Sequence, residues 1–120
     1  MSAIRIVVDD VDESIAAYEV CGFTLAQRWG PPFAVLANGD IELWISGDGT
    51  SAVKLMSSLS AEQVVRARVR PVQEVDDLDA AEATLLADGW SRVAGPINGR
   101  GGSQILVERG SAFLEVFATR

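Results

Sequence analysis

Two glutamates of this sequence lie within short apolar runs, where a carboxylate could do chemistry. Glu42 belongs to the run Ile41–Ser46 (IELWIS), and Glu115 belongs to the run Phe113–Phe117 (FLEVF). Successive side chains of a strand point to opposite faces, so each glutamate shares a face with every second neighbour. A carboxylate that is desolvated in an apolar cleft can titrate near neutrality and act as a general base. If the protein is an enzyme, Glu42 and Glu115 are the candidate catalytic residues.

Aromatic and polar side chains alternate with these glutamates and are expected to line the same cleft. Trp44 and Ser46 share the predicted face of Glu42, and Phe117 shares that of Glu115. An indole on an open sheet face is costly to leave in water, so we expect Trp44 to contact a ligand. The predicted ligand-binding residues are Arg5, Trp29, Phe33, Glu42, Trp44, Ser46, Arg70, Glu115 and Phe117.

The aromatic residues also have plain structural interpretations, which the sequence leaves open. Trp44 could be covered by a dimer partner or by the segment 47–66. Trp29 and Phe33 could simply fix the turn Gly30–Pro31–Pro32, which lies between them.

The sequence contains no histidine and only one cysteine. The lack of histidine removes the usual general base at neutral pH, the commonest metal ligand and any Ser–His or Cys–His nucleophile pair. A single cysteine cannot form an intramolecular disulfide, which is typical of a cytoplasmic protein. The formal net charge of −7 is a poor match for nucleic acids and anionic membranes, and no apolar run approaches the length of a membrane span.

The elements that must position these residues come as a repeat. Residues 8–23 (VDDVDESIAAYEVCGF) align without a gap with residues 75–90 (VDDLDAAEATLLADGW). In each copy an aspartate, Asp10 or Asp77, can cap the start of a helix, and a glycine twelve residues later can end it. Apolar residues recur between them with a helical period. Each copy therefore predicts one helix.

Strands are expected on both sides of each helix, so that a strand–helix–three-strand unit occurs twice. The expected strands are 3–8, 23–29, 33–37 and 41–46 in the first unit, and 68–75, 90–94, 104–108 and 113–117 in the second. The glycine-rich stretch 95–103 is expected to be a flexible loop, and 60–66 to add a helical turn. We predict an α+β fold in a single domain, 1–120, with unit one at 1–47, a linker at 48–66 and unit two at 67–120. The mixed sheets of the two units are expected to form a cleft.

This two-unit pattern resembles the vicinal oxygen chelate superfamily, which includes glyoxalase I, bleomycin-resistance proteins and extradiol dioxygenases. The matching stretches are VVDDVDESIAAYEVCGF, FAVLANGDIELWISG, VDDLDAAEATLLADGW and GPINGRGGSQILVERGSAFLEVF, which cover nearly the whole chain. The resemblance implies two βαβββ units around a ligand-binding cleft, and a homodimer.

The resemblance also marks four positions at which metal-dependent members hold a metal ion. These positions fall on Ala3, Arg70, Glu42 and Glu115. Alanine has no ligand atom and a guanidinium stays protonated, so only two carboxylates remain, and we expect neither a metal nor a cofactor. Arg70 is expected to replace the metal electrostatically by pairing with Glu42 or with Glu115. The alternative is that both glutamates lie at a solvated sheet surface.

The resemblance and the lost metal ligands together favour a metal-free binding protein of the bleomycin-resistance type. It would sequester an antibiotic-like small molecule, planar and aromatic or cationic, and would have no nucleic-acid or membrane partner. The alternative is a metal-independent isomerase or lyase that uses Glu42 or Glu115 as its base. A metalloenzyme with displaced ligands and a structural or protein-binding module are further possibilities.

Overall fold

The computed structural model describes residues 2–119 and contains eight strands and four helices. The strands are β1 (Ser2–Val7), β2 (Thr24–Trp29), β3 (Phe33–Asn38), β4 (Ile41–Ser46), β5 (Val69–Val75), β6 (Ser91–Asn98), β7 (Gly102–Arg109) and β8 (Ala112–Thr119). The helices are α1 (Val11–Val20), α2 (Ser51–Lys54), α3 (Ala61–Ala67) and α4 (Leu78–Ala87). No helix among these residues is long and apolar enough to cross a membrane.

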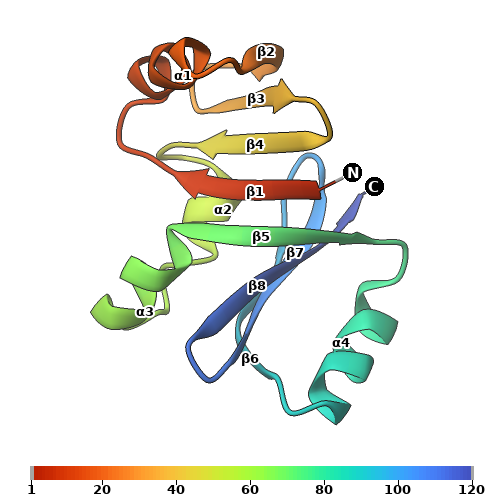
Figure 1. Cartoon of the computed structure of the whole chain (residues 1–120). Helices are drawn as coiled ribbons and strands as arrows, with labels where there is room; N and C mark the ends of the chain where they lie inside the picture. The colour runs from red at the N-terminus through yellow and green to blue at the C-terminus, as the bar shows by residue number, and fades with distance from the viewer. Residues whose placement is uncertain (1, 120) are drawn as a thin grey trace.

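All eight strands belong to one mixed sheet with the order β2-β3-β4-β1-β5-β8-β7-β6 (Figure 1). Each unit contributes four neighbouring strands, and the units join where β1 pairs with β5 in antiparallel register. At this joint Arg5 lies opposite Arg70, and Ala3 lies opposite Val72. The predicted α+β class with two βαβββ units is therefore confirmed.

The two repeat helices begin and end where the sequence signals predict. The Asp10 carboxylate accepts a hydrogen bond from the Glu13 amide at 3.0 Å, and the Asp77 carboxylate accepts one from the Ala80 amide at 3.1 Å. Such side-chain caps satisfy amide groups that the first helical turn leaves without partners. Gly22 and Gly89, with φ of 99° and 100°, turn the chain out of each helix in a conformation that favours glycine.

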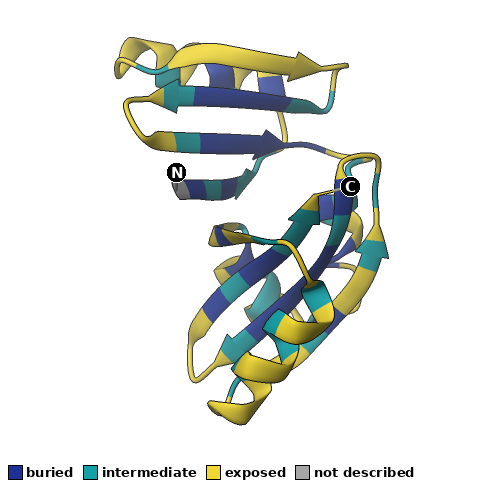
Figure 2. Cartoon of the chain, turned by 90° about the vertical axis from the view of Figure 1, so that its right-hand side faces the viewer, coloured by how far each residue is buried: buried dark blue, intermediate teal, exposed yellow. Residues whose placement is uncertain are grey.

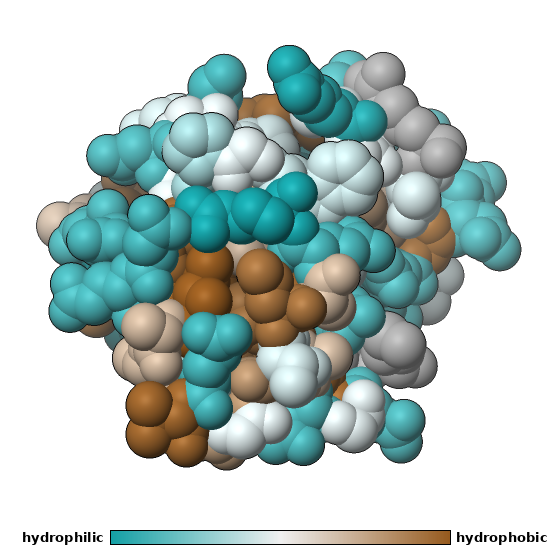
Figure 3. Space-filling view, turned by 90° about the horizontal axis from the view of Figure 1, so that it is seen from above, coloured by the Kyte–Doolittle hydropathy of each residue, from teal (hydrophilic) through white to brown (hydrophobic). Residues whose placement is uncertain are grey.

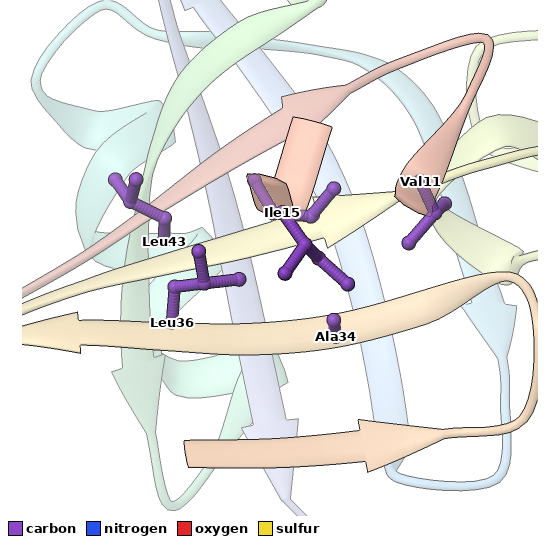
Figure 4. Packing of buried hydrophobic residues seen from close by; sticks show 6 residues of the cluster. Val11, Ile15, Ala34, Leu36 and Leu43 are labelled. Carbon is purple, nitrogen blue, oxygen red and sulfur yellow. The ribbon is translucent and has the colours of Figure 1, made fainter. Parts of the chain in front are cut away.

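Each repeat helix packs against the outer face of its own unit. In unit one, apolar residues of α1, β3 and β4 form a core cluster on this face (Figure 4). The buried members of this cluster are Val11, Ile15, Ala34, Leu36, Leu43 and Ile45. In unit two, α4 contributes Leu78, Ala81 and Leu85 to a second cluster with the buried β7 and β8 residues. The opposite side of the sheet is called the inner face below.

The linker covers the inner face of unit two, and this asymmetry decides where a site can lie. Leu55 and Met56, which follow α2, and Ala67 of α3 pack against Leu106 of β7 and Phe113 of β8. Among the described residues, no helix packs in the same way on the inner face of unit one. Its edge strand β2 is exposed along its whole length (Figure 2).

One sequence expectation about an irregular segment was wrong. The stretch 95–103 is not a long loop, because β6 continues to Asn98 and β7 begins at Gly102. Ser103 pairs with Asn98 and the Gly99 amide bonds the Gly102 carbonyl at 2.8 Å, so strand pairing overrides the low strand preference of a glycine-rich segment. The linker contains α2 as well as the expected turn at α3, which starts with a capping box between Ser60 and Gln63.

Candidate functional site

All nine predicted ligand-binding residues lie on the inner face. Residues that pair across neighbouring strands share a face, and the register connects the set through Trp29 with Phe33, Phe33 with Ser46, and Arg5 with both Trp44 and Arg70. Ala3 likewise connects Glu42 of β4 with Val72 of β5, which pairs with Glu115 of β8. Strand alternation therefore places the set correctly, and burial separates its members into two groups.

The first group is a closed ion triad of Arg5, Glu115 and Arg70. The Arg5 Nε and Nη2 atoms donate to the two carboxylate oxygens of Glu115 at 3.1 and 2.7 Å. The Arg70 Nε atom donates to Glu115 Oε1 at 2.9 Å. Arg70 and Glu115 have no exposed surface, and Arg5 keeps only 4% of its own.

Neutral groups complete the hydrogen bonding around the triad. Arg5 also donates to the Ser46 hydroxyl and to the Gln104 side chain, at 3.1 and 3.5 Å. Arg70 donates to the carbonyl oxygens of Ala67 and Ala52 at 2.8 and 3.2 Å, which attaches the linker helices to the triad. No buried side-chain nitrogen or oxygen among residues 2–119 lacks a partner. The buried hydrogen-bonding groups of the triad all have partners, but its two positive charges and one negative charge leave an excess of one positive charge.

The charges of the triad hold Glu115 ionised. Burial alone would raise the pKa of the Glu115 carboxyl, but the charges and hydrogen bonds of Arg5 and Arg70 outweigh it and lower that pKa below its ordinary value. Burial lowers the pKa of the Arg70 guanidinium, against the opposing effect of Glu115. A carboxylate with a lowered pKa and two bonded oxygens is a poor general base.

Acid should remove the stability that Glu115 provides. A carboxyl whose pKa is lower in the folded than in the unfolded state stabilises the fold fully above its unfolded pKa of about 4.3, and that stabilisation is lost as the pH falls through the folded pKa. Urea unfolding at about pH 6, 4 and 3 should therefore show the difference in stability between the wild type and Glu115→Gln narrowing in acid. A difference that stays constant over this range would contradict the ionised triad.

The second group is aromatic and begins with Trp44, which packs on the triad. The Arg5 guanidinium lies 4.9 Å from the centre of the Trp44 ring and 5.7 Å from that of Phe33. Phe117 meets Trp44 edge-on, with ring centres 5.5 Å apart. Only 8% of Trp44 is exposed, because residues of the chain's own strands cover it. It is not buried by the 47–66 linker, which was one of the two alternatives considered.

Outside the triad, accessible surface on the inner face remains at Trp29 and Phe33, and also at Glu42 toward the other end of β4. Trp29 is 61% exposed, and its indole nitrogen donates to the Gln27 side chain at 3.0 Å. Phe33, Phe117 and Glu42 are half-buried. Glu42 stands apart from the triad, and its Oε1 atom accepts a hydrogen bond from the Trp44 indole at 3.0 Å. A ligand on this face would meet aromatic rings and one carboxylate.

The residues at the four metal positions do not fit a metal ion. Ala3 has no donor atom, and Arg70 places a positive charge where a metal ion would lie, already bonded to Glu115. The structure also resolves the pairing of Arg70, which is with Glu115 and not with Glu42.

Sequence reasoning missed that Arg5 pairs with Glu115 and that Gln104 joins the site. Gln104 donates to the Ser51 hydroxyl at 3.2 Å and is almost fully buried. A glutamine directly before the apolar run Ile105–Val107 was a signal for a buried polar contact, but its partners come from β1 and α2, which the sequence separates widely from it.

Comparisons with known proteins place this fold among known structures. No family model and no curated protein matches the sequence. The chain is similar in structure to an NAD-dependent benzaldehyde dehydrogenase from Legionella pneumophila (TM-score 0.76, 11% identity, 100% of each chain covered). It is also similar to a glyoxalase/bleomycin resistance protein/dioxygenase superfamily member from Vibrio splendidus (0.64, 14% identity, 98% of this chain and 97% of that one covered).

A third similar structure is methylmalonyl-CoA epimerase from Mycobacterium tuberculosis, with a TM-score of 0.64 and 19% identity over 98% of this chain and 86% of that one. At these identities the similarities show the fold. The chain has the glyoxalase/bleomycin-resistance fold, which confirms the fold that the resemblance implies.

Proposed function

We propose that this protein is a metal-free binding protein that sequesters a planar small molecule, aromatic or cationic, on the inner face of unit one. The observation that supports the proposal is that aromatic residues on the inner face keep accessible surface, namely the exposed Trp29 and the half-buried Phe33 and Phe117. Aromatic rings stack on planar ligands, and their faces also attract cations. The ligand class includes antibiotic-like molecules, as the resemblance to bleomycin-resistance proteins suggests.

Binding without turnover is favoured because the polar centre of the fold is already occupied by its own charges. Arg5 and Arg70 bond both oxygens of Glu115, so this carboxylate neither abstracts a proton nor holds a metal. The triad stabilises the face on which the ligand would rest. It has almost no exposed surface from which to contact that ligand.

Glu42 supports a second candidate function, a metal-independent isomerase or lyase. Its carboxylate is half-buried beside Trp44, and the hydrogen bond from the indole engages Oε1 and leaves Oε2 without a side-chain donor. A carboxylate placed in this way can act as a general base. The distinguishing observation is the fate of a bound ligand, which is released unchanged by a binding protein and converted by an enzyme.

A fluorescence titration tests the binding proposal. Replacing Trp90 with Phe, the residue type at the matching position Phe23, leaves Trp29 and Trp44 as the only indoles, and both lie on the inner face. Saturable quenching is expected with 9-aminoacridine, a planar cation. In this background Trp29→Ala should weaken binding about tenfold, since an aromatic pair contributes about 0.5–1.5 kcal/mol.

The matched control removes an exposed apolar side chain elsewhere. Leu86 of α4 is 47% exposed and far along the chain from the site, and Leu86→Ala should leave the affinity unchanged. If Trp29→Ala and Leu86→Ala bind 9-aminoacridine with equal affinity, the proposed site is wrong. Mass spectrometry of the released ligand then separates the two functions, and conversion that Glu42→Gln abolishes would establish the enzyme.

The proposal includes a homodimer in the cytoplasm. Each of its chains is a single domain, with unit one at 1–47, the linker at 48–66 and unit two at 67–120. Apolar surface near β2 supports the dimer. Val20 and Leu25 are 90% and 44% exposed, and Figure 3 shows apolar residues gathered among hydrophilic ones at the end of the molecule that carries α1 and β2. A second copy would protect this surface from water.

A further inference from the structure

Two adjoining hollows lie where β1 and β4 end. One has a volume of about 310 Å³ and lies between the end of β1 and the linker helices. The other, of about 370 Å³, lies beside the start of α1 and the Pro31–Pro32 turn. Asp9 and Asp48 line both hollows, which adjoin at these two residues and are together called the groove. None of the nine inner-face residues lines it.

The first hollow has an apolar floor that comes from both unit one and the linker. Its apolar residues are Val7, Val8, Val53, Met56 and Val64. Met56 is buried, whereas the four valines are only partly covered. An apolar body that displaces water from such a floor forms a more stable complex, because apolar surface is removed from water.

The groove is lined by more acidic than basic residues. Asp9 and Asp48 line both hollows, Asp10 and Asp12 line the one beside α1, and Arg68 lines the other. Arg68 lies 3.5 Å from Asp9, and Arg28, which does not line the groove, lies 2.8 Å from Asp12. Asp10 caps α1. Asp48 forms no ion pair and no side-chain hydrogen bond with any residue from 2 to 119.

We infer that this groove binds an amphipathic organic cation, with the charged head beside Asp48 and Asp9 and the apolar body on the floor of valines and Met56. The charge complementarity selects against anions, because an anion would meet the excess of carboxylates. The apolar floor selects against small hydrated cations, which cannot replace the water lost from it. The site is separate from the proposed inner-face site and does not depend on it.

Calorimetric titration of the purified protein with decyltrimethylammonium, below its micelle concentration, tests the inference. Saturable binding of one cation per chain is expected, and decyl sulfate, with the same chain and the opposite charge, should not bind. Asp48→Asn should weaken binding about fivefold at low salt, as expected for the loss of one neighbouring charge at a partly exposed site.

Asp40→Asn is the matched control, because Asp40 is an exposed aspartate at the opposite end of β4 and has no ion-pair partner in residues 2–119. It makes the formal net charge less negative by one, as Asp48→Asn does, and should change the affinity little. Equal weakening by the two substitutions would overturn the inference, since it would reflect the field of the whole protein. On addition of the cation, nuclear magnetic resonance spectra should show shifted amide signals at residues 7–9, 48, 53–57 and 64–68. Shifts centred on Trp29 and Phe33 would contradict binding in the groove and would support the inner-face site instead.

Discussion

Replacing Glu115 with glutamine should lower the free energy of unfolding by about 3–5 kcal/mol, because it leaves two buried guanidinium groups without a counterion. The carboxylate accepts three charge-assisted hydrogen bonds from Arg5 and Arg70 and has no exposed surface. The glutamine is similar in shape, so the loss measures charge rather than volume. Urea unfolding at neutral pH, followed by circular dichroism, measures it.

Two further variants make this prediction specific. Glu42→Gln removes the corresponding carboxylate of unit one, which is half-buried and accepts a single hydrogen bond, and should cost less than about 1 kcal/mol. Arg5→Met reduces the excess buried charge from one positive charge to none, whereas Glu115→Gln increases it to two. Arg5→Met should therefore be the milder change even though it removes four hydrogen bonds. A larger loss for Arg5→Met or for Glu42→Gln would show that charge balance does not control the stability of the triad.

Trp44→Ala should destabilise the protein by about 3–5 kcal/mol, as the truncation of a buried aromatic residue does. The indole fills the space between Phe117 and the Arg5 guanidinium and is 8% exposed. Trp29→Ala provides the comparison, because a side chain that is 61% exposed should contribute no more than about 0.5 kcal/mol to stability.

The two tryptophans should therefore separate folding from binding. Thermal unfolding monitored by circular dichroism measures the first effect, and the 9-aminoacridine titration measures the second. We expect Trp44→Ala to lower the midpoint of unfolding strongly, and Trp29→Ala to weaken the ligand while leaving the midpoint unchanged. If Trp29→Ala lowers the midpoint as much as Trp44→Ala, Trp29 is a structural residue and the proposed platform is wrong.

The sequence predicted the fold well because its strongest signals are local and occur twice. An aspartate cap, an apolar helical period and a glycine after the helix act within about fifteen residues, and both copies retain them. The segment 95–103 gave the opposite outcome. Its glycines suggest a loop, and only pairing of β7 with β6 and β8 makes it extended, which no local signal contains.

The sequence predicted on which face of the sheet the site residues lie, but not how far each of them is buried. Alternation along single strands placed seven of the nine residues on one face, because the period of two is a property of each strand, whereas Trp29 and Phe33 were selected from the turn between them. Whether a residue on that face is accessible depends on neighbours from distant segments. Trp44 was expected to contact a ligand but is covered by Phe117 and other strand residues, and the partner of Arg70 required knowing that β8, and not β4, lies beside β5.

The link between Arg5 and Glu115 has a consequence for how the protein is made. These residues are 110 positions apart, and β1, the first strand of the chain, lies in the middle of the sheet between β4 and β5. During synthesis Arg5 and Arg70 leave the ribosome well before β8, so the two guanidinium groups have no carboxylate to neutralise them until Glu115 follows. Contacts this distant in sequence also slow folding. The nascent chain should therefore remain incompletely folded, with its apolar inner face in water, until its last strand appears, and this interval is when it should depend most on chaperones.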